Sequence, residues 1–194
     1  MARIALVGNM RSGKDTFADV LINEQGYTRI AFADELKRIC KELFPEQFKN
    51  GNKPREILQN VGKCMRSIDY DVWVKALDRK IKQYNVVTNM YEIKEDNLVI
   101  TDVRYPNEVG YLIDNGFTIV QIFVDRSILE ERCKATDPNF NPMQLDHESE
   151  FMASNCTVGD ILIYNNNSLE EYLDTVHKVI ADIEGGVTNE RWYV

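Results

Sequence analysis

Short apolar runs alternate along the chain with longer stretches in which apolar side chains recur every three or four positions. The runs predict buried parallel strands, and the longer period predicts helices that each bury one face. Five strands are expected, at residues 4–7, 29–33, 98–102, 117–124 and 160–164. Helices are expected from residue 17 onwards and at 34–44, 54–66, 71–84, 106–115, 126–134 and 168–183. This alternation indicates an α/β fold with a five-stranded doubly wound parallel sheet, whose ligands bind at the carboxyl ends of the strands.

Small polar residues, glycine and proline mark where several helices begin and end. Ser168 and Glu171 have the spacing of a capping box at the start of the last helix. Pro106 suits the first turn of its helix, and Asn115-Gly116 predicts a left-handed turn at its end.

Three stretches show no regular period. Residues 85–97 are polar and are expected to be a connection, whereas 187–194 receive no element. Residues 135–145 contain Asp137-Pro138 and Asn141-Pro142, which exclude regular structure. Such a stretch inside a compact domain is either a lid over a site or a surface loop.

Composition narrows the class of protein. The 194 residues are 44% hydrophobic and 28% charged, which suits one ordinary globular domain. The formal net charge of −8 disfavours nucleic acid polymers and anionic membranes as partners, but a local arginine cluster can still hold a small phosphorylated ligand. No apolar run approaches the roughly 18 residues of a membrane span and no signal peptide is recognised, so a soluble, cytoplasmic protein is expected. The four cysteines lie far apart and are expected to be reduced thiols, not zinc ligands.

The most informative motif follows the first strand. Gly8 and Gly13 bound a loop that ends in Lys14 and leads into a helix, which is the setting of a phosphate-binding loop. Backbone N–H groups of such a loop and of the helix start point at a bound phosphate, and the lysine adds a charge. Asp15 stands where a magnesium-binding Ser or Thr is usual, and the hydroxyl comes one residue later at Thr16. The alternative is a surface turn with an exposed lysine.

A second motif follows the third expected strand. Asp102 ends the apolar run 98–101 and Arg104 comes two residues later, so both are expected at the same edge of the sheet as the loop. The carboxylate can hold Mg²⁺ beside the donor phosphates, and the guanidinium can reach a phosphate.

Other candidates have two interpretations each. Arg55, Gln59 and Arg66 line one face of a helix, as a solvated stripe or as a ligand-binding row. Trp73 is either a core residue or a stacking platform for a base. His147 lies three residues before Glu150, and a lone histidine of this kind is usually structural.

With these motifs collected, the chain resembles the deoxynucleoside monophosphate kinases found mainly in bacteriophages, within the P-loop kinase superfamily. The matching segments span nearly the whole chain: Arg11-Ser12-Gly13-Lys14-Asp15-Thr16, the Arg55–Gln59–Gly62 helix, Trp73-Val74-Lys75, Asp102-x-Arg104-x-x-x-Glu108, His147-x-x-Glu150, and Ile163-x-Asn165 with Ser168-Leu169-Glu170-Glu171. Asp15 after the lysine looks normal for this family. Residues 44–54 and 127–146 carry no recognised pattern.

The resemblance implies one P-loop kinase domain over 1–194, with a helical acceptor-binding insert at about 34–85 and a lid at about 126–150. It implies transfer of a phosphoryl group from ATP, with Mg²⁺, to a (deoxy)nucleoside 5′-monophosphate. The implied catalytic residues are Lys14, Asp102, Arg104 and Arg132, and the ATP phosphates would be bound by residues 11–16. The implied acceptor-binding residues are Lys37, Arg55, Gln59, Arg66, Trp73, Arg104, Glu108 and Glu150. Asn165 and Asn166 would lie beside the adenine, Arg126, Arg132 and Lys134 in the lid, and Thr16 and Asp102 at the metal.

Two other classes remain open at this point. Another small-molecule P-loop kinase, of the dephospho-coenzyme A or phosphomevalonate type, would differ only in its acceptor pocket. A nucleotide-dependent switch or regulatory ATPase is disfavoured because the chain has no N-K-x-D guanine-reading segment. The accepted bases, the sugar preference and the oligomeric state are left open, with a homodimer as one alternative.

Overall fold

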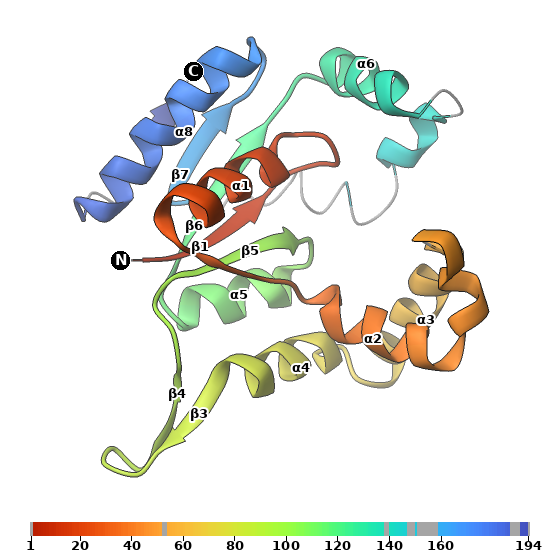
Figure 1. The fold of residues 1–194 in the computed structure, drawn as a ribbon, viewed down its shortest axis with the longest axis vertical. Helices are drawn as coiled ribbons and strands as arrows, with labels where there is room; N and C mark the ends of the chain where they lie inside the picture. Colours follow the sequence, from red (N-terminus) through yellow and green to blue (C-terminus); the bar gives the residue numbers. More distant parts are fainter. Residues whose placement is uncertain are drawn as a thin grey trace. The chain divides into compact units, whose positions relative to one another are not determined.

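A six-stranded sheet organises the larger part of this computed structural model, which describes residues 2–51, 54–137, 140–146, 150, 159–186 and 191–193 (Figure 1). The strand order is β2-β5-β1-β6-β7-β8. The strands are β1 (Arg3–Val7), β2 (Thr28–Ile30), β5 (Leu98–Val103), β6 (Phe117–Phe123), β7 (Ile161–Tyr164) and β8 (Arg191–Tyr193). β1 pairs in parallel with β5 on one side and β6 on the other, so the strand that leads into the glycine-bounded loop is central.

The chain divides into two compact units. One comprises Met1–Arg29 and Asp96–Val194 and contains most of the sheet; the other is Ile30–Glu95. The second unit includes the residues expected to form the acceptor-binding insert. None of the helices among the described residues combines the length and apolar character needed to cross a membrane.

Helices cover both faces of the sheet because successive strand residues point to opposite sides. Ile4 and Leu6 of β1 point to the face covered by α1 (Lys14–Gln25) and α8 (Leu169–Glu184), which lie side by side. α5 (Pro106–Asp114) packs beside β6 and buries Val109 and Leu112. The loop after β1 is therefore anchored by a strand that is buried on both faces.

The capping signals act as predicted. The Ser168 hydroxyl accepts from the Glu171 backbone N–H, and the Glu171 carboxylate accepts from the Ser168 N–H at 3.0 Å, which completes the capping box of α8. Pro106 is the first residue of α5, and Gly116 after it has a left-handed φ of 71°.

The second unit consists of helices followed by a hairpin. Its elements are α2 (Ala33–Leu43), the 3₁₀ helix η1 (Pro45–Gly51), α3 (Arg55–Ile68), α4 (Val72–Ile81), β3 (Lys82–Asn85) and β4 (Met90–Ile93). Gly62 lets α2 and α3 approach closely, since a Cβ there would lie 3.2 Å from Leu36 Cδ2. Its carbonyl also accepts from Trp73 Nε1 at 3.4 Å, so the indole is a buried packing residue of this unit.

Two predictions about strands were wrong. The sheet has six strands and not five, because residues 191–193 pair with β7. β8 is short and leaves Trp192 exposed, so it lacks the apolar run by which a buried strand is recognised. The strand expected at 29–33 is Thr28–Ile30, because the chain turns at Phe32 and enters α2 at Ala33.

A further correction concerns the region between α4 and β5. The helix expected to reach residue 84 ends at Ile81, and the stretch expected to be a connection contains the β3–β4 hairpin. Val86 and Val87 at its turn and Met90 and Tyr91 of β4 are exposed. Its strands therefore have little of the half-buried alternation that identifies a strand in a sequence.

The buried sheet face predicts a stability effect. Ile163 of β7 is fully buried, whereas Leu169 at the start of α8 is 64% exposed. We expect Ile163→Ala to lower the free energy of unfolding by about 2–5 kcal/mol, and Leu169→Ala to change it by less than about 0.5 kcal/mol. Urea denaturation followed by circular dichroism measures both. Equal losses in the two variants would contradict the assigned core.

Candidate active site

The loop between β1 and α1 has the backbone geometry of a phosphate cradle. Gly8 has φ 156° and Gly13 has φ 106°. A Cβ at Gly8 would lie 2.6 Å from the Ile122 carbonyl oxygen, and one at Gly13 would lie 2.6 Å from Asn165 Nδ2. Both positions therefore require glycine for space as well as for conformation.

The Lys14 side chain folds back over this loop. Its Nζ donates to the carbonyl oxygens of Gly8 at 2.8 Å and of Asn9 at 2.5 Å, and it lies 3.4 Å from Ser12 Oγ. The pKa of Lys14 is lowered to about 8, chiefly by burial and next by the nearby positive charge of Arg104. The structure therefore places the Lys14 side chain at the end of the central strand, over the glycine-bounded loop.

Three acidic residues partly offset the lowering of the Lys14 pKa. The negative charges of Glu150, Asp15 and Asp102 raise the Lys14 pKa, in that order of size. All of them therefore lie within electrostatic reach of the loop lysine. The sequence prediction that Asp102 and Arg104 emerge at the same sheet edge as the loop agrees with this arrangement.

The loop is held from the far side by residues at the end of β7 and on α8. Asn165 Nδ2 donates to the Ser12 carbonyl at 2.9 Å, and the Tyr172 hydroxyl donates to the Gly13 carbonyl at 3.0 Å. Arg132 of α6 (Arg126–Thr136) donates to the Asn165 carbonyl at 3.0 Å. Burial raises the pKa of Tyr172, so its hydroxyl stays a donor. Sequence reasoning missed Tyr172, because its spacing on α8 marks only a core position.

The other predicted adenine-side residue makes a separate contact. The Asn166 side-chain oxygen accepts from the Asp125 backbone N–H at 2.9 Å, immediately before α6 begins. Asn165 and Asn166 thus connect the end of β7 to the loop and to the base of α6. Whether they also contact adenine stays a prediction.

Arg104 meets the loop through a buried carboxylate. Its guanidinium donates to Glu150 Oε1, and Glu150 Oε2 accepts from the Met10 backbone N–H at 2.7 Å. Glu108 Oε2 accepts from the backbone N–H groups of Arg104 at 2.7 Å and Tyr105 at 3.0 Å. Two residues predicted to bind the acceptor, Glu108 and Glu150, therefore both hold Arg104.

The predicted lid packs against the loop. Leu129 and Cys133 of α6 and Leu145 of the 3₁₀ helix η2 (Pro142–Asp146) form a small cluster, against which Met10 and Phe140 pack. Burial raises the pKa of the Cys133 thiol. Met10 was not singled out from the sequence, since nothing in the motif specifies the residue at that position.

Ion pairs tie the same segment together. Arg126 pairs with Asp146 at 2.6 Å and with Glu130 at 3.1 Å, and Lys134 lies 3.9 Å from Glu130. Arg126 and Lys134 thus form ion pairs within the predicted lid, whereas Arg132 donates a hydrogen bond to Asn165, which itself contacts the loop. His147 lies outside the described residues.

Two residues near the loop have side chains that could contribute ligands to Mg²⁺ alongside substrate phosphates and water. Within the described residues, no group of three or more histidine, cysteine or carboxylate side chains is placed to hold a metal by itself. Mg²⁺ usually takes one or two protein ligands together with substrate phosphates and water. Half-buried Thr16, in the first turn of α1, and Asp102, at the end of β5, supply a hydroxyl and a carboxylate of that kind.

Most predicted acceptor residues lie in the second unit. Lys37, Arg55 and Gln59 are exposed, Arg66 is half-buried, and Trp73 is buried. Their role in binding stays a prediction.

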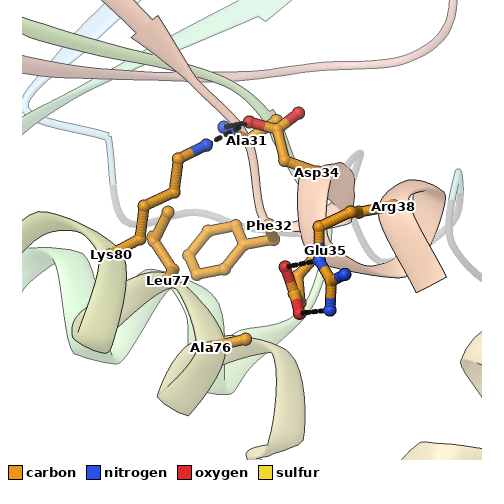
Figure 2. A pocket seen from close by; sticks show the side chains of 8 residues that line it. All are labelled: Ala31, Phe32, Asp34, Glu35, Arg38, Ala76, Leu77 and Lys80. Atoms are coloured by element: carbon orange, nitrogen blue, oxygen red, sulfur yellow. Dashed lines mark hydrogen bonds and ion pairs between the residues drawn. The ribbon is translucent and has the colours of Figure 1, made fainter.

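The same unit contains a cavity of about 340 Å³, shown in Figure 2. Phe32 and Leu77 form its apolar wall. Asp34 accepts from Lys80 Nζ at 2.9 Å at the rim. Its complete lining is Ala31, Phe32, Asp34, Glu35, Arg38, Ala76, Leu77 and Lys80. None of the predicted acceptor residues belongs to that lining.

The parallel sheet, the glycine-bounded loop after β1 and the lysine that follows it define the P-loop kinase fold. Solved structures agree. A gluconokinase from Sinorhizobium meliloti 1021 matches with a TM-score of 0.58 and 16% identity, covering 96% of this chain and 95% of that one. A dephospho-CoA kinase from Campylobacter jejuni matches with a TM-score of 0.56 and 15% identity, covering 95% and 98%. At these identities the likeness establishes the fold.

Sequence similarity narrows the class. No protein-family model matches the chain. A relative from Acanthamoeba polyphaga mimivirus, named "Putative deoxynucleotide monophosphate kinase", is 29% identical over 196 residues, covering 91% of this chain and 94% of the relative. The resemblance to the deoxynucleoside monophosphate kinases is thereby confirmed, and together with the fold it supports a phosphotransferase.

Two left-handed glycines provide a test of the loop geometry. Gly26 after α1 has φ 70° and open space around it, whereas Gly13 is crowded by Asn165 and Tyr172. Gly26→Ala should cost only the left-handed strain of about 1–2 kcal/mol. Gly13→Ala should cost about 2–5 kcal/mol because the crowding adds to the strain. Urea unfolding of both variants measures the difference, and equal costs would contradict the packed loop.

The charges around Lys14 predict pKa changes of opposite sign. Arg104→Gln removes a positive charge and should raise the Lys14 pKa above about 8, whereas Glu150→Gln removes a negative charge and should lower it. The ¹³Cε chemical shift of Lys14, followed against pH in lysine-labelled ligand-free protein, reports the titration. A Lys14→Met sample assigns the signal. Shifts in the same direction in both variants would contradict the described arrangement.

Proposed function

We propose that this chain is an ATP- and magnesium-dependent kinase that transfers a phosphoryl group to (deoxy)nucleoside 5′-monophosphates and produces diphosphates. The observation that supports this proposal most is the position of Lys14. Its ammonium group donates to the carbonyls of the glycine-bounded loop, and Arg104, Asp102 and Glu150 lie within electrostatic reach of it. The mimivirus relative supports the choice of acceptor.

On the donor side, the backbone N–H groups of residues 11–16 surround the ATP phosphates, as expected where a loop leads into a helix. Lys14 moves from the carbonyls of Gly8 and Asn9 to the phosphate oxygens, which replace them as acceptors. Thr16 and Asp102 would hold Mg²⁺, which neutralises the developing charge on the phosphates. Asn165 and Asn166 would face the adenine.

On the acceptor side, Arg104 binds the phosphate of the monophosphate. Lys37, Arg55 and Arg66 are further candidates for binding the acceptor. Gln59 and Trp73 would lie near the base. A monophosphate oxygen is already anionic, so the reaction requires no dedicated base. Alignment of the two substrates can supply about 7–11 kcal/mol of the barrier reduction. A well-placed arginine, for which Arg132 and Arg126 of the lid are further candidates, contributes about 10³–10⁵ in rate.

An assay of ADP formation with a panel of acceptors tests this proposal. ADP production should depend on both Mg²⁺ and a nucleoside monophosphate from a ribo- and deoxyribonucleotide panel. Lys14→Ala and Arg104→Ala should each lower kcat/KM by at least about 100-fold, because each removes a donor to transition-state charge.

Lys178→Met, which removes an exposed lysine on α8, is the matched control and should leave turnover unchanged. Hydrolysis of ATP without any acceptor would indicate a regulatory ATPase instead. Transfer to dephospho-coenzyme A or phosphomevalonate but to no nucleotide would indicate the other small-molecule kinases.

A further inference from the structure

Glu150 is a carboxylate almost completely withdrawn from solvent. It is 1% exposed, and its neighbour in the ion pair, Arg104, keeps 33% of its side-chain surface exposed. A buried carboxylate is costly unless charged or polar donors compensate it. Here one oxygen accepts from the Arg104 guanidinium and the other from the Met10 N–H at 2.7 Å.

Glu108 and Glu150 together determine where the Arg104 side chain points. Glu108, itself 2% exposed, accepts from the Arg104 backbone N–H at 2.7 Å and so fixes where the side chain begins. Glu150 fixes where the side chain ends, from a position 46 residues further along the chain. Arg104 is thus held at both ends while part of its surface stays open to a ligand.

Glu150 connects three segments of the proposed site: the glycine-bounded loop, the end of β5 and the predicted lid. Its backbone carbonyl accepts from Asn9 Nδ2 at 3.3 Å, and its side chain accepts from Met10, so it contacts the loop twice. Through Arg104 it reaches the end of β5. Because Met10 also packs against the cluster formed by Leu129, Cys133 and Leu145, the same loop residue contacts the predicted lid.

We propose that Glu150 is the positioning residue that holds the Arg104 guanidinium beside the phosphate loop, so that this arginine binds the acceptor phosphate without first having to be ordered. This inference rests on the proposed function, since it concerns how that kinase site is preorganised. Glu150 then acts through Arg104 and makes no contact of its own with the acceptor.

Glu150→Gln is the informative substitution because it keeps an oxygen for the Met10 N–H but removes the charge that pairs with Arg104. The first measurement is NMR of the arginine side chains in the full, ligand-free chain, with Arg104→Lys identifying the Arg104 signals. In the unmodified protein the Arg104 guanidinium should show hindered rotation, and Glu150→Gln should release it. Glu35→Gln is the matched control, because it breaks the exposed Glu35–Arg38 pair and should leave the Arg104 signals unchanged.

The second measurement is steady-state kinetics with the best acceptor of the four deoxynucleoside monophosphates. Glu150→Gln should raise the KM for the acceptor by about 10- to 100-fold, the loss expected for a hydrogen bond to a charged group, and should change the KM for ATP less. Adding Arg104→Ala to Glu150→Gln should lower kcat/KM little beyond Arg104→Ala alone, since the two residues act as one unit. If Glu150 had a merely structural role, Glu150→Gln would lower kcat/KM and the unfolding free energy together, and the KM values for the acceptor and for ATP would change alike.

The outcomes separate the two claims. A freely rotating Arg104 in an active kinase overturns the inference alone. An acceptor KM that falls in Glu150→Gln overturns it as well, because the carboxylate would then compete with the acceptor phosphate. A hindered Arg104 in a chain that phosphorylates no nucleotide overturns the proposed function and with it the catalytic part of the inference.

Discussion

An ammonium group enclosed by a tight turn of backbone is the constraint on which the larger unit depends. The Lys14 Nζ donates hydrogen bonds to the carbonyl oxygens of Gly8 and Asn9 in place of water, and its pKa is nevertheless lowered to about 8, chiefly by burial. Such a turn exists only if Gly8 and Gly13 carry no side chain and if the strand before it cannot move. β1 meets the second requirement by lying between β5 and β6.

Positive charge is concentrated locally although the protein as a whole is acidic. The chain has a net charge of −8, yet Lys14 and Arg104 gather at one edge of the sheet and act on each other electrostatically. Glu150 and Asp102 moderate the repulsion between these two cations. The negative charge of a ligand such as the proposed phosphate would meet positive charge that is already concentrated there.

The segments around the loop are coupled by contacts that differ in kind. Hydrogen bonds from Asn165 and Tyr172 hold its carbonyl side, and the Glu150 carboxylate holds its amide side at Met10. Apolar packing joins Met10 to α6 and η2. The predicted lid takes part in both kinds of contact, because Glu150 at its end hydrogen-bonds to Asn9 and Met10 of the loop while Leu129 and Leu145 belong to the apolar cluster.

The sequence by itself determined the elements whose signals are local. The apolar run of β1, the glycines of the loop, Lys14, the buried strands β5 to β7 and the capping box of α8 each depend on residues close together in the chain. Tertiary structure decided whatever depends on distant neighbours. β8 is a strand because β7 offers its edge, Trp73 is buried where α4 meets its neighbouring helices, and Glu150 meets Arg104 across 46 residues. Periodicity reports which side of an element is apolar, but it carries no information about which partner will cover that side or complete an ion pair.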